Sequence, residues 1–205
     1  PPRVWYFADG LSQVLSICQT EEGDMAIIPL ERMETARLLL RRTRGEDAED
    51  IFREYAQDPE VTRYLLWPPH TDIAQTQAFM EHCAMVWEKG EAYPYAIVRR
   101  EDGMLAGMIE ARMDSHRAEI GYVLAGRFWG RGYMSEAVSA VVRWAAAQHG
   151  IHRVWAYCDA ENRASQRVVE KAGLEREGRV RKWALSPNIS GIPRDCIFYS
   201  LPSRD

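Results

Sequence analysis

Residues 127–135, with the sequence RFWGRGYMS, place two glycines and two arginines directly before a helix-like run. The N-terminus of a helix presents backbone N–H groups that lack intrahelical partners, and it carries a partial positive charge. Gly130 and Gly132 would let an anion approach the backbone closely, and the guanidinium groups of Arg127 and Arg131 match phosphate oxygens. The stretch therefore predicts a phosphate or pyrophosphate site, with a tight turn that only needs glycine as the structural alternative.

Two common phosphate-binding motifs fit this stretch poorly. A nucleotide P-loop ends in Gly-Lys-Ser/Thr, a tripeptide that the sequence does not contain. A dinucleotide-binding fold could use Gly130, Gly132 and Ser135, followed by Asp159 at the end of the next strand. However, the bulky residues 125–129 stand where that fold makes a tight turn, and antiparallel hairpins are predicted before them. A dinucleotide-dependent oxidoreductase therefore remains only as a minor alternative.

Several polar side chains near the glycines could move protons. Glu119 lies on the predicted strand before the glycines and Glu110 on its hairpin partner, but alternation alone does not fix which face either occupies. Asn162 and Ser165 are three residues apart and share one face of a predicted helix, which Asn162 also suits as the N-cap. For both glutamates the alternative is an exposed strand position. His70 and His116 are further candidates for a base, with a surface position as the alternative for each.

The elements that must position these residues follow from hydrophobic periodicity and from turn residues. Asp72 and Gln75 predict a capping box at the start of the second helix. Helices are expected over 46–58, 71–90, 133–150 and 162–173, and strands over 35–43, 95–100, 104–113, 118–125, 151–159, 178–185 and 194–201. The short links between the second, third and fourth strands indicate antiparallel hairpins. This order predicts the α/β (α+β) class, with one mixed, mostly antiparallel sheet and helices on both faces.

The composition is that of a globular protein, with 205 residues of which 46% are hydrophobic and 27% charged. The formal net charge of −4 argues against a general nucleic-acid binder, and no apolar run is long enough to span a bilayer. The four cysteines have no metal-ligand spacing, so no metal is predicted. We expect a cytoplasmic protein with no nucleic-acid or membrane partner. Residues 1–32 are expected to form an extension of unknown role, and residues 33–205 the functional domain.

Five segments together resemble the GNAT acetyltransferases, in particular their RimJ/RimL-like branch. They are ETARLLLRR (34–42), AEIGYVL (118–124), the Arg-x-x-Gly-x-Gly motif (127–132), DAENRASQRVVEKAGLEREG (159–178) and GIPRDCIFYSL (191–201). The resemblance runs from about residue 34 to 201, with the motifs in the family's order. It implies a GNAT fold with a splayed central strand pair, and acetyl-CoA as the cofactor without a metal.

The resemblance also assigns roles to individual residues. Backbone amides of the loop and helix start are expected to bind the coenzyme pyrophosphate, and the strand end at 122–124 is expected to bind the pantetheine arm. The expected coenzyme contacts are Tyr122, Val123, Leu124, Arg127, Phe128, Trp129, Gly130, Arg131, Gly132, Tyr133, Met134, Asn162 and Ser165. For Val123 and Leu124 the alternative is a plain sheet core. Val169 stands where many GNAT enzymes carry a tyrosine that acts as general acid, which leaves Ser165 or water for that role.

The acceptor side is expected across the cleft from the coenzyme. Trp67, Pro68, Pro69 and His70 would form a rigid wall there, or else a hydrophobic staple for the following helix. Glu119 is favoured as the base, Glu110 is expected to contact the acceptor, and Trp183 and Asp195 are expected on the same side. The resemblance implies direct acetyl transfer to a primary amine, either a protein N-terminus or a small molecule. A non-catalytic acyl-CoA-binding module is the alternative, and a homodimer is among the assemblies allowed.

Overall fold

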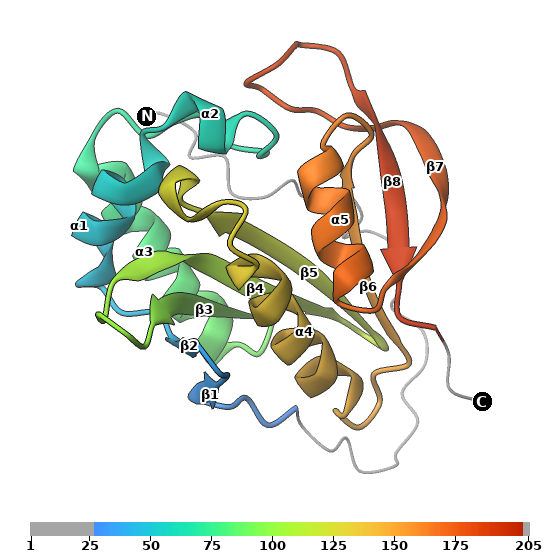
Figure 1. The fold of residues 1–205 in the computed structure, drawn as a ribbon, viewed down its shortest axis with the longest axis horizontal. Coiled ribbons are helices and arrows are strands. Elements are labelled where there is room, and N and C mark those ends of the chain that lie inside the picture. Colours follow the sequence, from blue (N-terminus) through green and yellow to red (C-terminus); the bar gives the residue numbers. More distant parts are fainter. Residues whose placement is uncertain (1–26, 203–205) are drawn as a thin grey trace.

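The computed structural model describes residues 27–202, so most of the extension predicted over 1–32 lies outside the described residues. The elements in chain order are β1 (Arg32–Glu34), β2 (Leu38–Arg42), α1 (Asp47–Ile51), η1 (Phe52–Ala56), α2 (Pro59–Thr62), α3 (Ile73–Glu88), β3 (Ala92–Arg99), β4 (Leu105–Asp114), β5 (Arg117–Leu124), η2 (Gly126–Phe128), α4 (Tyr133–Ala146), β6 (Arg153–Asp159), α5 (Arg163–Lys171), β7 (Glu175–Ala184) and β8 (Arg194–Ser200). Figure 1 shows their arrangement. No helix within 27–202 is long and apolar enough to cross a membrane.

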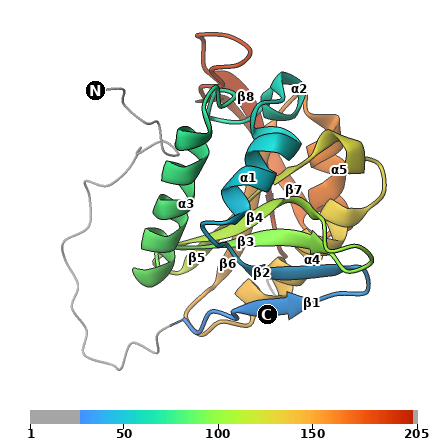
Figure 2. The same ribbon diagram turned by 90° about the vertical axis from the view of Figure 1, so that its left-hand side faces the viewer.

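One eight-stranded sheet organises the molecule, in the order β1-β2-β3-β4-β5-β6-β8-β7. Helices α4 and α5 contact each other on one face, in front of the sheet in Figure 1, whereas α1 and α3 pack together on the other face. Figure 2 shows the two helix layers from the side. The mixed, mostly antiparallel sheet with helices on both faces that the sequence predicts is therefore confirmed. A mainly parallel dinucleotide-binding sheet is not what the described residues form.

The central strands β5 and β6 are parallel, and they pair over only a short stretch. Register pairs join Arg117 to Arg153, Ala118 to Val154 and Glu119 to Trp155. Beyond Glu119, β5 continues to Leu124 along β4 without a partner on the β6 side. Backbone groups at this edge would need other hydrogen-bond partners. The divergence opens a gap through the middle of the sheet, as the predicted splayed strand pair requires.

The helix after the glycines forms as its periodicity predicts. Met134, Ala137, Val138, Val141, Trp144 and Ala145 are all buried. They lie along one side of α4, which packs on β4 and β5. The apolar stripe therefore fixes the direction in which the N-terminus of α4 faces the gap. In the second predicted helix, Asp72 and Gln75 form the capping box at the start of α3.

Two regions differ from the sequence prediction. β1 was not predicted, since three residues are too few for a periodic signal, yet Met33 pairs with Leu40 and is buried. The helix predicted over 46–58 is α1 followed by a π-helical turn at 52–56, and a separate short helix α2 begins after it. A π-turn inserts a residue into the helical ladder, which a 3.6-residue pattern does not reveal. Asp58 and Pro59, an N-cap followed by proline at N1, were the available signal for α2.

Gly107 in β4 lies opposite Leu124, where the two backbones approach closely. A Cβ atom at this position would stand 2.2 Å from the carbonyl oxygen of Val123. We expect Gly107→Ala to lower the free energy of unfolding by about 1–3 kcal/mol, because the strand must shift to make room. Urea denaturation monitored by circular dichroism measures this change. Gly178→Ala in β7 is the control, since its added Cβ would meet nothing within 4 Å; equal effects of the two substitutions would contradict the steric argument.

Candidate functional site

Both glycines of the 127–132 segment adopt backbone conformations that other residues rarely take. Gly130 has φ +74° and Gly132 has φ +79°. Gly132 is the N-cap of α4. No side chain caps this helix end among the described residues. The N–H groups of the first turn are therefore available to an anion, and no side chain of the loop crowds the approach at Gly130. A phosphate cradle is compatible with this geometry, although glycine is also needed for the turn itself.

The guanidinium groups of the loop are placed differently from the sequence prediction. Arg127 forms an ion pair with Glu54 at 2.5 Å and lies over the ring of Phe128. Phe128 is itself buried in the core. Arg131 is exposed, and its carbonyl oxygen accepts a hydrogen bond from Arg37. Any anion at the loop would therefore depend first on backbone N–H groups.

Arg37 is a residue that the sequence analysis missed. Its Nε donates to Glu136 at 2.7 Å, its backbone N–H donates to the same carboxylate at 2.9 Å, and its guanidinium lies over the ring of Tyr133. These contacts join the start of β2 to the first turn of α4. Arg37 and Glu136 are 99 residues apart, so no local sequence pattern links them.

A cavity of about 890 Å³ passes through the gap between β5 and β6, because residues from both faces of the sheet line it. Most of the predicted site residues line this cavity. Those predicted to contact the coenzyme are Tyr122, Val123, Leu124, Trp129, Gly130, Gly132, Met134, Asn162 and Ser165. Those predicted on the acceptor side are Trp67, His70, Glu110 and Glu119. Arg127, Phe128, Arg131 and Tyr133 do not line it. The carbonyl of Leu124 already accepts a hydrogen bond from the Trp129 indole at 2.8 Å.

On the α4/α5 face, Asn162 and Ser165 stand at the start of α5. Asn162 is the N-cap, and its Oδ1 accepts a hydrogen bond from the Ser165 N–H at 3.1 Å. The predicted capping role of Asn162 is therefore confirmed. The Ser165 hydroxyl lies 2.7 Å from the phenol oxygen of Tyr122 on β5. This contact was not predicted, since it joins residues 43 positions apart.

On the α1/α3 face, two carboxylates and one guanidinium form a group on neighbouring strands. Arg112 contacts Glu110 at 2.5 Å and Glu119 at 3.4 Å. All three residues line the cavity, and both glutamates occupy the same face, because Glu119 pairs with Arg112, which is two residues from Glu110 on β4. Burial raises the pKa of Glu119, although the nearby Arg112 opposes this, and Glu110 raises it further. Two carboxylates face one guanidinium here, an excess of acidic groups that favours a cationic ligand.

The segment from 63 to 70 covers the acceptor side of the cavity. Trp67 packs against His70 with ring centroids 5.0 Å apart, and His70 Nδ1 lies 2.7 Å from the hydroxyl of Thr76. Burial lowers the pKa of His70, so the imidazole is neutral at neutral pH. His116, the other histidine considered as a base, does not line the cavity. It lies at the β4–β5 turn, where its carbonyl accepts from His152.

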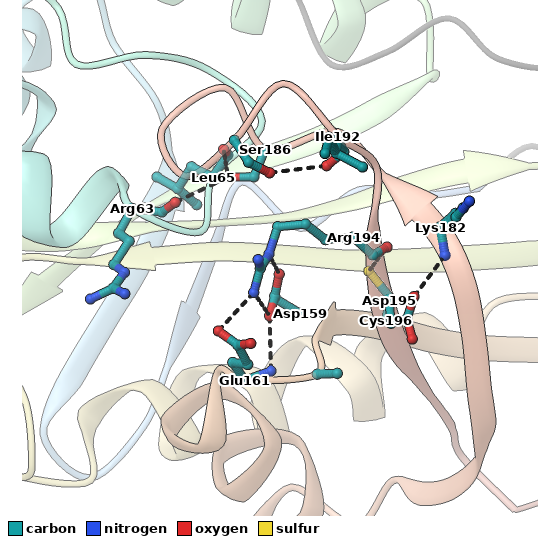
Figure 3. Close-up of polar contacts among 12 residues, drawn as sticks. Arg63, Leu65, Asp159, Glu161, Lys182, Ser186, Ile192, Arg194, Asp195 and Cys196 are labelled. Atoms are coloured by element: carbon teal, nitrogen blue, oxygen red, sulfur yellow. Dashed lines mark hydrogen bonds and ion pairs between the residues drawn. The ribbon is translucent and has the colours of Figure 1, made fainter.

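Side chains after β7 hold this covering segment in place. Ser186 donates to the carbonyl of Arg63 at 3.0 Å, and Figure 3 shows it against Arg63 and Leu65. Asn188 donates to the carbonyls of Thr62 at 2.7 Å and Trp67 at 2.8 Å. Two loops more than 100 residues apart in sequence are thereby fastened together over the acceptor side.

Trp183 and Asp195 do not line this cavity, contrary to the sequence prediction. Asp195 instead accepts from the backbone N–H of Lys182 at 2.9 Å (Figure 3). It also accepts from Arg179. It lines a separate hollow of about 350 Å³. Lys182 has φ +53°, and the sheet register shifts beside it. The carboxylate of Asp195 on β8 therefore stabilises an irregular turn of the neighbouring strand β7.

Comparisons with known proteins agree with this geometry. The family model for the acetyltransferase (GNAT) domain matches residues 37–175. YoaA, an N-acetyltransferase of Bacillus subtilis (strain 168), is 34% identical over 172 residues, which cover 82% of this chain and 95% of the relative. The ribosomal protein uS5-alanine N-acetyltransferase of Escherichia coli (strain K12) is 25% identical, over 89% of this chain and 96% of the relative.

A solved structure shares the fold. The RimL ribosomal alpha-N-protein acetyltransferase in complex with coenzyme A superposes with a TM-score of 0.72 at 22% identity. The match covers 81% of this chain and 94% of that chain.

Removing the Asn188 amide should loosen the covering segment. We expect Asn188→Ala to speed amide hydrogen exchange over residues 62–70 by about tenfold, because two carbonyls lose their donor. Hydrogen exchange read by mass spectrometry measures this. Ser190→Ala is the control, since the Ser190 hydroxyl bonds only within its own loop, to Ile192. Unchanged exchange in Asn188→Ala would show that the loops are held by other contacts.

Proposed function

Because the chain belongs to the GNAT family of acetyltransferases, and is thus an acetyl-CoA-dependent acyltransferase, we propose that it transfers acetyl directly to a primary amine. One observation carries the proposal. A single cavity joins the uncapped N-terminus of α4 to the carboxylates Glu110 and Glu119 across the sheet. The first can hold the pyrophosphate of the coenzyme, and the second can receive an amine. The thioester would then lie in the gap between β5 and β6.

Direct transfer is favoured over an acetyl-cysteine intermediate. Cys158 and Cys196 line the cavity, and burial raises the pKa of each thiol to about 12. Both thiols are therefore protonated near neutral pH, whereas the thiolate is the nucleophilic form of cysteine. The amine must attack the thioester itself, and a base must remove its proton as the bond forms.

Glu119 is proposed as that base, acting directly or through water. Its side chain is about one-fifth exposed, at 22%, and it faces the cavity on the acceptor side. Burial places its pKa above the ordinary value for glutamate, which brings its basicity closer to that of a useful proton acceptor. Glu110, Trp67 and His70 are proposed to contact the acceptor around the amine.

Two acceptor classes remain within the proposal, and relatives suggest both. One relative is named for acetylating an alanine of a ribosomal protein, which makes a protein N-terminus one candidate. A structural neighbour, the microcin C7 self-immunity acetyltransferase, was solved with acetyl-CoA and AMP, and suggests a small-molecule acceptor. A panel of peptides with free N-termini and of small primary amines, assayed for thiol release from acetyl-CoA, tests the proposal. Thiol release with no member, despite CoA binding, would favour the non-catalytic CoA-binding alternative.

Gly130 should be required for coenzyme binding beyond its role in the turn. We expect Gly130→Val to raise the Kd of CoA by tenfold or more, that is by at least about 1.4 kcal/mol, because the side chain crowds the phosphate approach. Isothermal titration calorimetry measures the Kd. Gly150→Val is the matched control, since Gly150 has φ +78° with equally open surroundings but lies beyond the end of α4. If the Kd of CoA rises equally in both variants, backbone strain alone would explain the loss of affinity, and the phosphate cradle at Gly130 would be contradicted.

The pH dependence should identify the base. A base works deprotonated, so activity is expected to fall as pH falls through the pKa of Glu119, which burial raises above 4.5. Glu119→Gln should lower kcat/KM at neutral pH by about 100-fold and remove this acidic limb. Glu110→Gln should keep the limb but move it to lower pH, because Glu110 raises the pKa of Glu119. An unaltered pH profile in Glu119→Gln would exclude this residue as the base.

A further inference from the structure

Helix α5 offers no phenol to the departing sulfur. Val169 occupies the position where the resemblance leads one to expect a tyrosine, and its side chain is 1% exposed within the hydrophobic core. When the amine nitrogen bonds to the acetyl carbon, the carbon–sulfur bond breaks and the electron pair stays on sulfur. A hydrogen-bond donor placed at that sulfur lowers the barrier by stabilising the negative charge that develops there.

Ser165 and Tyr122 are the hydroxyl-bearing side chains on this side of the cavity that contact each other. Tyr122 lies on β5 and Ser165 on the first turn of α5, with 2.7 Å between the phenol and hydroxyl oxygens. Tyr122 and Glu119 are three positions apart in the strand, so they point to opposite faces of the sheet. The Tyr122 phenol therefore lies on the α5 side of the gap, on the face opposite to the carboxylate of Glu119.

The direction of the hydrogen bond decides what Ser165 can do. The phenol can donate to the Ser165 carbonyl at 3.1 Å, and it shares a 2.7 Å hydrogen bond with the Ser165 hydroxyl in which either oxygen can be the donor. In α5 that carbonyl already has a helical partner four residues on, and a phenol is a stronger donor than an aliphatic hydroxyl. The 2.7 Å contact is also the usual length of an O–H···O bond. These points favour Tyr122 as donor and the Ser165 hydroxyl as acceptor.

With Tyr122 donating, the proton of Ser165 is directed away from the phenol. The Ser165 side chain lines the cavity, as Tyr122 does, so a proton directed away from the phenol can point into the space proposed for the thioester. Burial raises the pKa of Tyr122, which keeps its proton in place for donation. The Ser165 hydroxyl is thus held by the Tyr122 phenol at the cavity wall.

We propose that Tyr122 is a positioning residue that holds the Ser165 hydroxyl so that its proton points at the coenzyme sulfur, where it stabilises the departing thiolate. The inference rests on the proposed acetyl transfer. No proton leaves Tyr122 or Ser165 in the step. The amine proton goes to the base on the acceptor side, and the thiolate takes a proton from solvent as CoA departs.

A double-mutant cycle tests whether Tyr122 acts through Ser165. Tyr122→Phe and Ser165→Ala should each lower kcat about tenfold while leaving the Kd of acetyl-CoA unchanged. The variant carrying both substitutions should be no slower than Ser165→Ala alone, since the phenol has no function once the hydroxyl is gone. Losses that multiply in the double variant would overturn the proposal. Tyr199→Phe is the control, because this buried phenol bonds Glu170 of the same helix at 3.1 Å without lining the cavity.

A second measurement needs no acceptor. The ultraviolet absorbance of the thiolate of bound CoA, titrated with pH, reports how well the site stabilises the charge on sulfur. Tyr122→Phe and Ser165→Ala should each lower the acid dissociation constant of the bound CoA thiol about tenfold, so that its pKa rises by about one unit. Tyr199→Phe should leave this pKa unchanged. A wild-type titration curve in Tyr122→Phe would overturn the proposal. If the wild type transfers no acetyl group to any amine, but the two substitutions still shift the ionisation of bound CoA as expected, the result would count against the proposed function and not against the role of Tyr122.

Discussion

The short parallel pairing of β5 with β6 is the constraint on which the rest of the site depends. The two strands share register only at residues 117–119, and β5 then follows β4 alone to Leu124. A fully paired sheet would separate the two faces, and no group on one face could act on a molecule held by the other. The gap removes that barrier while the strands remain anchored at one end. Gly107 contributes at the far end of the unpaired stretch, because β5 approaches β4 closely at Val123 and Leu124.

The two sides of the gap differ in how they treat charge. The α4/α5 side offers backbone N–H groups at the start of α4, whose dipoles favour an anion and do not titrate. The α1/α3 side offers two carboxylates, and the ionisation of Glu119 there depends on burial and on the nearby Arg112. A fixed positive potential suits a group that keeps its charge throughout, such as pyrophosphate. A titratable carboxylate suits an amine that must lose a proton.

The sequence predicted those features that local patterns control. Periodicity located α3, α4 and α5, and glycines at positive φ explain the turn before α4. It could not predict contacts between distant segments, such as Arg37 with Glu136 or Asn188 with Trp67, because spacing along the chain carries no record of them. It also misplaced Asp195, since this carboxylate accepts from the backbone of the irregular turn at Lys182 on the neighbouring strand β7, a contact that spacing does not reveal. Side-chain chemistry was predictable, whereas the partner of each side chain often was not.

The long-range contacts divide the cavity wall into a part held by packed elements and a part held by loops. Arg37, directly before β2, braces the start of α4, and its partners are Glu136 and Tyr133 of α4 and the carbonyl of Arg131. The acceptor side is covered by 63–70, a loop held by side chains of another loop. Loops tolerate substitution better than packed elements, because fewer buried contacts depend on them. Changes at 63–70 or 186–188 can therefore reshape the acceptor cavity while the gap, the helix dipole and the Tyr122–Ser165 pair stay in place.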